Sequence, residues 1–170
     1  GWIYKRNVAN RQRDWIGKGY VSSFYDPYHP GARKMFWGMM NTSLFSKGID
    51  AWWMDATEPD VTSNLSPQQR KEFSGPNYFG SSTKYYNAFS LVNAQGVYEG
   101  QRKADSRKRV FILTRSSYAG LQRYAAATWS GDIGSRWEDF KHQIPAGLNF
   151  SMSGMPYWTT DIGGFAVEPR

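Results

Sequence analysis

The chain has 170 residues, of which 40% are hydrophobic and 17% aromatic, so it can bury the core of one domain or of part of one. A formal net charge of +7 raises nucleic acid as a partner, but the basic residues collect in two polar stretches, 5–13 and 102–109, without a phosphate-binding glycine loop or an RNA-binding aromatic motif. We therefore expect no nucleic-acid partner. The absence of cysteine excludes disulfides and thiolate metal sites, and no apolar run approaches the roughly 18 residues that span a membrane.

The first half of the chain predicts a helix, a strand, a long loop and a second helix. A helix follows His29-Pro30-Gly31, because Met and Phe residues recur every three or four positions until Gly48. Residues 49–55 are too few and too aromatic for a helix, and they predict a buried strand. Residues 59–80 are rich in Pro, Ser, Gly and Asn and predict a loop, and a helix is expected at about 83–99.

The second half continues this alternation. Residues 110–115 are the plainest strand of the chain. Strands that alternate with helices predict parallel strands joined by helical crossovers. The remaining predicted elements are a turn or short helix at 117–124, a strand at 125–129, a helix at about 135–148 with Pro145 as a candidate kink, and a strand at 156–161.

Each of the four predicted strands ends in a charged residue: Asp55, Arg115, Asp132 and Asp161. In a β/α barrel, catalytic groups lie at the carboxyl ends of the strands. An open doubly wound sheet also places groups there, but it usually carries a glycine-rich phosphate turn, which this sequence lacks. The pattern therefore favours an α/β fold of the barrel type, with a site at these four strand ends.

Carboxylates at such a site are typical of glycosidic bond hydrolysis, in which one carboxyl group attacks the anomeric carbon and another protonates the leaving oxygen. Taken singly, Asp55, Asp132 and Asp161 also fit helix caps or turn residues. Glu58 is either an acid that contacts the catalytic residues without touching the sugar, or a surface residue. Arg115 either binds a substrate hydroxyl or pairs with an aspartate of the barrel.

The aromatic load fits the same hypothesis. Eight Trp, eleven Tyr and ten Phe offer faces that stack on sugars, although such residues also fill ordinary cores. The two histidines, His29 and His142, are interpreted as structural. No spacing of His, Asp and Glu suggests a metal site, so we expect neither a metal ion nor a cofactor.

Four motifs of this sequence resemble those of glycoside hydrolase family 31, which contains α-glucosidases and α-xylosidases. The segment Trp52-Trp53-Met54-Asp55-Ala56-Thr57-Glu58-Pro59-Asp60 resembles the family's nucleophile motif. Residues 113–120, 123–132 and 154–165 resemble the family's next strands, in the same order. Together the motifs cover nearly the whole chain from Phe24 onward.

The resemblance implies a part of a (β/α)₈ TIM barrel, about four to five consecutive βα units, and a retaining mechanism that needs no metal or cofactor. It assigns the nucleophile to Asp55 and the acid/base to Asp132. Residues 1–170 would then form a partial catalytic domain, without the first strands, the last strand and the flanking β domains of the family. The implied sugar contacts are Trp53, Arg115, Trp129, Asp161 and Phe165.

Within the family, the nucleophile motif followed by Asn64 and a Ser-Pro step is most similar to bacterial α-xylosidases. These enzymes release α-xylosyl groups from xyloglucan-type oligosaccharides. An α-glucosidase or transglycosylase of the family acting on α-glucan fragments, or an inactive carbohydrate-binding piece, remains an alternative. We expect the remainder of the catalytic domain as a partner and little activity from the isolated chain. The compartment stays open, and the periplasm or the cell exterior is compatible with a bacterial parent.

Overall fold

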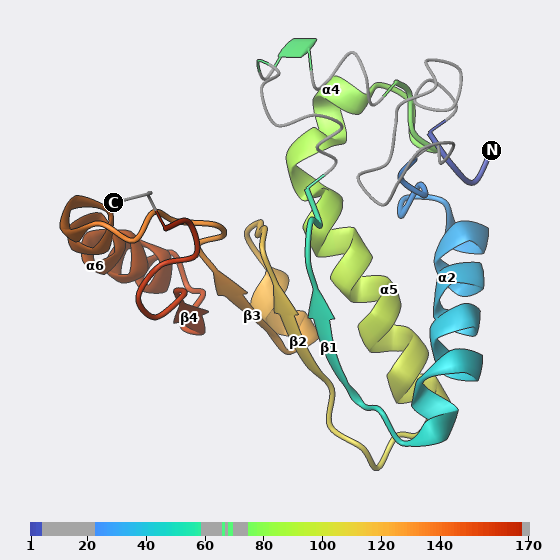
Figure 1. The fold of residues 1–170 in the computed structure, drawn as a ribbon. Helices are drawn as coiled ribbons and strands as arrows, with labels where there is room; N and C mark the ends of the chain where they lie inside the picture. Colours follow the sequence, from blue (N-terminus) through green and yellow to red (C-terminus); the bar gives the residue numbers. More distant parts are fainter. Residues whose placement is uncertain (5–22, 59–65, 67, 70–74, 168–170) are drawn as a thin grey trace.

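The computed structural model describes residues 1–4, 23–58, 66, 68–69 and 75–167 (Figure 1). The basic stretch at 5–13 and the motif residues Asp60 and Asn64 lie outside the described residues. Most of the predicted loop at 59–80 also lies outside them.

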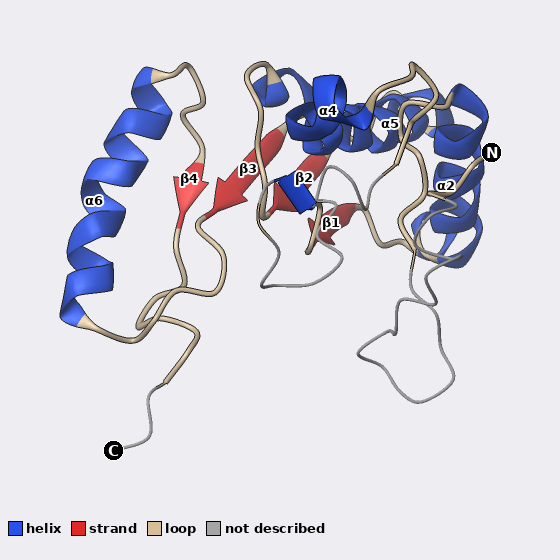
Figure 2. Ribbon diagram, turned by 90° about the horizontal axis from the view of Figure 1, so that it is seen from above, coloured by secondary structure: helices blue, strands red, loops and turns tan. Residues whose placement is uncertain are grey.

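Four parallel strands form one sheet in the described part of the chain, in the order β1-β2-β3-β4. Met54 pairs with Thr114, which pairs with Thr128, so the carboxyl ends of the first three strands lie at one level. The strands fan out as an arc with helices along its outer side (Figure 2). This confirms the prediction of parallel strands joined by helical crossovers. The strands are β1 (Ala51–Met54), β2 (Phe111–Thr114), β3 (Ala126–Trp129) and β4 (Trp158–Thr159).

The helix that precedes β1 begins where the sequence predicts. In α2 (Pro30–Ser43), the ring nitrogen Nδ1 of His29 accepts hydrogen bonds from the backbone N–H groups of Gly31 at 3.0 Å and Ala32 at 3.4 Å. His29 is therefore a helix cap, as its structural interpretation required. The pattern that reaches Gly48 divides into α2 and a short 3₁₀ helix, η1 (Phe45–Lys47).

The helical region predicted at 83–99 consists of three pieces and runs further than the apolar pattern. These are α4 (Ser82–Tyr85), η2 (Tyr86–Ala88) and α5 (Phe89–Ala104). The extension follows from Gln101, which is fully buried and accepts a hydrogen bond from Trp52 Nε1 at 2.7 Å. A polar residue therefore continues the buried face of α5 beyond its last apolar position.

The core lies between the sheet and helices α2 and α5, which run side by side (Figure 1). Gly100 of α5 makes this approach possible, because a Cβ at that position would lie 2.3 Å from Cγ of Trp37 in α2. The buried core residues are Trp52, Met54, Ala94, Val97, Val110, Ile112, Leu121 and Ala126.

The last elements differ in their bounds from the prediction. After η3 (Leu121–Tyr124), Ala125 has a left-handed backbone with φ of +54°, so β3 begins at Ala126 rather than at residue 125. Helix α6 (Trp137–Met152) passes through Pro145 and continues beyond the predicted residue 148. The strand predicted at 156–161 is reduced to β4, which pairs only with β3.

Helix α6 buries no side chain, although its apolar residues recur along one face. Five of these large apolar residues are exposed: Trp137, Phe140, Ile144, Leu148 and Met152. Among the described residues, no helix is both long enough and apolar enough to cross a membrane.

Candidate active site

Three charged side chains from three neighbouring strands meet at the carboxyl end of the sheet. Nη1 of Arg115, which follows β2, lies 3.2 Å from Oδ1 of Asp55 and 3.6 Å from Oδ2 of Asp132. Asp55 follows β1, and Asp132 follows β3 after a short turn. Arg115 therefore pairs with barrel aspartates, which is one of the two roles that the sequence left open.

The shared guanidinium limits the separation of the two aspartates. Because Oδ1 of Asp55 and Oδ2 of Asp132 both contact Nη1, they lie no farther apart than the sum of the two contact distances. A nucleophile and an acid/base in a retaining glycosidase are roughly 5–5.5 Å apart. The arrangement is compatible with that spacing.

Glu58 binds the other edge of the same guanidinium. Its Oε1 accepts a hydrogen bond from Nε of Arg115 at 2.8 Å and a second, shorter one from Nη2. The Glu58 and Arg115 side chains are 27% and 23% exposed, whereas those of Asp55 and Asp132 are 57% and 50% exposed. Partial burial disfavours the charged guanidinium, but the hydrogen bonds and charges of Glu58, Asp55 and Asp132 outweigh it and raise the pKa of Arg115.

The turn that carries Asp55 is fastened to the next strand. Ala56 has a left-handed backbone with φ of +48°, and its N–H donates to Oδ1 of Asp55 at 2.7 Å. The next residue, Thr57, is buried and hydrogen-bonds to the hydroxyl groups of Thr114 and, at 3.1 Å, Ser116. These hydrogen bonds fix Thr57, which lies between Asp55 and Glu58 in the turn. Thr57 was not among the residues predicted for the site, although its position between two candidate acids could have indicated it.

The turn before Asp132 rests on the arginine. Gly131 has a φ of +82°, and a Cβ built there would lie 3.2 Å from Cδ of Arg115. The backbone of Gly131 therefore lies directly against the aliphatic stem of Arg115. This contact couples the position of Asp132 to that of the guanidinium. The sequence alone did not predict this contact between Gly131 and Arg115.

The two predicted aromatic sugar contacts differ in exposure. Trp53 is 74% exposed, because alternate residues of β1 face opposite sides of the sheet and Trp52 takes the buried side. Trp129 is buried and packs edge-on against Trp53, with ring centroids 6.1 Å apart. Trp53 therefore exposes its indole ring, and the buried Trp129 packs against that ring.

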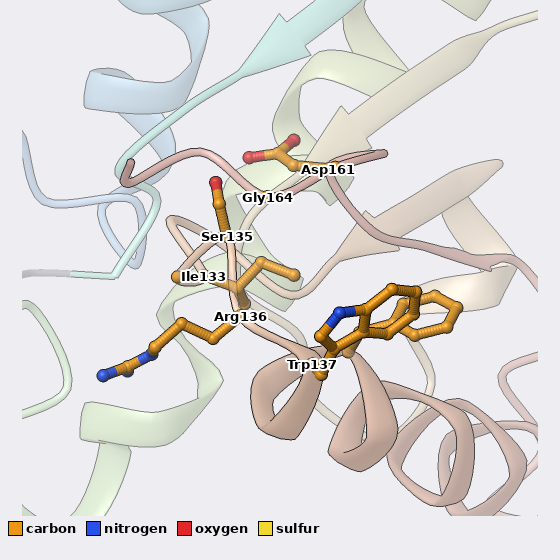
Figure 3. A pocket seen from close by; sticks show the side chains of 9 residues that line it. Ile133, Ser135, Arg136, Trp137, Asp161 and Gly164 are labelled. Atoms are coloured by element: carbon orange, nitrogen blue, oxygen red, sulfur yellow. The ribbon is translucent and has the colours of Figure 1, made fainter. Parts of the chain in front are cut away.

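Asp161 lines a separate pocket of about 490 Å³ beyond β4, and Phe165 follows Gly164, another of its lining residues (Figure 3). Asp161 lies on one side of this pocket and Trp137 on the other. The exposed Phe165 donates its N–H to the carbonyl of Ile133 at 2.9 Å, next to the same pocket. Within the described ranges, Arg115 pairs with Asp55, Glu58 and Asp132 and not with Asp161.

No group of three or more His, Asp or Glu side chains in the described part of the chain is arranged to hold a metal ion. The described strand ends bring together the carboxylates of Asp55, Glu58 and Asp132 and the guanidinium of Arg115. Paired carboxylates at the strand ends of a parallel β/α sheet are the arrangement of β/α-barrel glycosidases.

Comparison with known proteins identifies the family. The model for the TIM-barrel domain of glycosyl hydrolases family 31 matches residues 1–170, so the chain belongs to that family. The resemblance of the four motifs and the barrel fold expected from it are thereby confirmed.

The relatives include enzymes with two specificities. An α-xylosidase of Saccharolobus solfataricus is 43% identical over 90% of this chain and 21% of its own length. An α-glucosidase of the same organism is 31% identical over 89% of the chain and 25% of its own length. The crystal structure of a family 31 α-xylosidase from Xanthomonas citri covers 100% of the chain and 18% of that protein, with 58% identity and a TM-score of 0.94. The chain therefore spans about a fifth to a quarter of the length of these relatives.

Proposed function

We propose that the protein carrying this chain is a retaining α-glycosidase that releases α-xylosyl groups from xyloglucan-type oligosaccharides. The observation that carries this proposal is the shared contact of Asp55 and Asp132 with Nη1 of Arg115. This contact keeps the two carboxyl groups within a separation that is compatible with double displacement, which supports the proposal.

The mechanism has two steps. Asp132 donates its proton to the glycosidic oxygen while a carboxylate oxygen of Asp55 attacks the anomeric carbon, which breaks the glycosidic bond and forms a covalent glycosyl ester. Asp132, now a carboxylate, then takes a proton from water as the water attacks the same carbon and releases Asp55. Two inversions leave the sugar with its α configuration. Nη1 of Arg115 lies 3.2 Å from Oδ1 of Asp55, so the guanidinium contacts the carboxylate that attacks.

Substitution of the nucleophile tests the mechanism. We expect Asp55→Ala in the full-length protein to lower kcat/KM on an aryl α-xyloside by about 10⁴-fold or more, because no carboxylate remains to attack. Added azide should restore turnover of this variant and yield the β-xylosyl azide, since a single displacement inverts the anomeric carbon.

A matched control lies at the other end of the same strand. Asp50 precedes β1 and pairs with Lys108 at 3.0 Å on the partly exposed surface. Asp50→Ala should leave kcat/KM within about twofold of the native value, because such surface pairs contribute little. An Asp55→Ala protein with native activity, or an α-configured azide product, would show that the nucleophile is another residue.

The second candidate function is α-glucosidase activity, which the α-glucosidase relative favours. The two differ in whether the site accepts the hydroxymethyl group of glucose. We expect kcat/KM on an aryl α-xyloside to exceed that on the matching α-glucoside by about tenfold or more, since rejection of a bulkier group typically gives factors of this size. A larger rate on the glucoside assigns the protein to the glucosidases of the family.

A further inference from the structure

Among the described residues, Glu58 contacts the guanidinium of Arg115 more closely than Asp55 or Asp132 does. Its Oε1 receives both Nε and Nη2 of the guanidinium. That leaves Nη1 as the group that contacts Asp55 at 3.2 Å and Asp132 at 3.6 Å. The orientation of Nη1 between the two aspartates is therefore set by Glu58, because a guanidinium is planar and rigid.

The aliphatic part of Arg115 is fixed from the other side. The backbone of Gly131 lies against it so closely that a Cβ would approach Cδ to 3.2 Å. A displacement of the guanidinium by one bond rotation would thus shift both the contact with Asp55 and the turn that carries Asp132. Glu58 after β1, Arg115 after β2 and Gly131 after β3 form one linked set.

The charges in this set are unbalanced. Three carboxylates, from Glu58, Asp55 and Asp132, lie on one guanidinium. Oε2 of Glu58 is buried and has no hydrogen-bond partner among the described residues. It borders an open pocket of about 400 Å³ that Asp132 also lines. Glu58 therefore places a second negative charge near the acid/base without removing the guanidinium from the nucleophile.

We propose that Glu58 is a positioning residue that orients the guanidinium of Arg115, so that Nη1 stays between the carboxylates of Asp55 and Asp132. This role rests on the proposed function. It extends that function by assigning a role to Glu58, an acid that touches neither the sugar nor the reacting atoms.

Glu58→Gln removes the charge but keeps an oxygen that accepts from Nε. In the full-length protein we expect roughly 100-fold lower kcat/KM on an aryl α-xyloside with a poor leaving group, because a displaced catalytic group typically has an effect of this size. A leaving group that departs without protonation should suffer a smaller loss, since it needs the acid less.

Glu99→Gln is the matched control, because Glu99 is exposed on α5 and accepts a hydrogen bond from Gln95. It should leave kcat/KM on both leaving groups unchanged.

The outcomes separate the two proposals. If the native protein hydrolyses neither α-xyloside nor α-glucoside, the proposed function fails. If the native protein is active and Glu58→Gln loses activity equally on both leaving groups, Glu58 is only structural and the positioning role is overturned. Unchanged activity of Glu58→Gln also overturns it. A larger loss on the poor leaving group supports the positioning role, provided that circular dichroism shows the variant to be folded.

Discussion

At the scale of single residues, Asp132 is carried by a turn that only glycine accommodates well. Gly131 combines a φ of +82° with a backbone that touches the Arg115 stem. We expect Gly131→Ala to lower the free energy of unfolding by about 1–3 kcal/mol, because an L-residue is strained in this region of backbone space. It should also lower kcat/KM, because the new methyl group pushes on the guanidinium. Urea unfolding and aryl glycoside hydrolysis measure the two effects.

The control for this substitution is a glycine with the opposite properties. Gly38 lies inside α2, and a Cβ there would meet no atom within 4 Å. Gly38→Ala should raise the free energy of unfolding by roughly 0.5–1 kcal/mol, because alanine loses less conformational freedom in a helix. Equal effects of the two substitutions would contradict the strained-turn argument.

The sequence predicted the charged residues of the site better than it predicted their partners. Asp55, Arg115 and Asp132 were singled out because each closes a strand, and the parallel sheet does bring those ends to one level. The contact of Gly131 with the arginine was not predicted, because it depends on how two loops from different strands cross. Asp161 also closes a strand, but the fanning of the sheet carries β4 toward the pocket beside Trp137.

At the scale of elements, local pattern located every described helix and strand but misplaced several ends. Helix α5 runs past its apolar pattern because Gln101 is buried by hydrogen bonds rather than by hydrophobicity. Strand β3 starts late because Ala125 is left-handed. Strand β4 is reduced to Trp158 and Thr159, which pair with Thr128 and Trp129 of β3. In each case a contact distant in sequence, or a backbone angle, decided what composition alone leaves open.

Gln101 itself provides a prediction at this scale. Its Oε1 accepts from Trp52 Nε1 at 2.7 Å, and its Nε2 donates to the carbonyl of Arg109 at 3.1 Å, so it joins β1, α5 and the entry to β2. Gln101→Leu fills the space but leaves the buried Trp52 Nε1 without a partner and removes the hydrogen bond to the carbonyl of Arg109. We expect the free energy of unfolding to fall by about 1–3 kcal/mol, the usual cost of one orphaned buried group. Thermal and urea unfolding of the full-length protein measure it.

The same substitution on the outer part of α5 is the comparison. Gln95 donates to Glu99 across one turn of the exposed surface. Gln95→Leu should change the free energy of unfolding by no more than about 0.5 kcal/mol, as is usual for surface positions. If Gln101→Leu were as mild as Gln95→Leu, the hydrogen bonds would not explain why the helix continues to Ala104.

At the scale of the whole molecule, the described sheet is an arc rather than a closed barrel (Figure 2). A (β/α)₈ barrel takes about 250 residues and leaves no open strand edge. Along α6 the exposed apolar face runs from Trp137 to Met152. Such a face normally packs on a neighbouring element. We expect a further βα unit of the same barrel to cover it in the full-length protein.

Substitution of Leu148 tests whether the apolar face of α6 is covered in the full-length protein. The same substitution should have a favourable effect in the 170-residue chain and an unfavourable one in the full-length protein. Leu148 is 62% exposed in the 170-residue chain. There Leu148→Glu should raise solubility and reduce binding of a hydrophobic dye, since it interrupts an open apolar face. In the full-length protein the same change should lower the free energy of unfolding by about 2–5 kcal/mol, because it buries an unpaired charge and removes apolar packing.

The matched control is Asn149→Glu on the same helix, which places the same carboxylate at an exposed position about 100° around the helix from Leu148, away from the apolar face. It should leave the stability of the full-length protein within about 0.5 kcal/mol of the native value. If Leu148→Glu were equally neutral in the full-length protein, the α6 face would be open to solvent there too. The barrel would then have to close along another surface, and the exposed stripe would need a different partner.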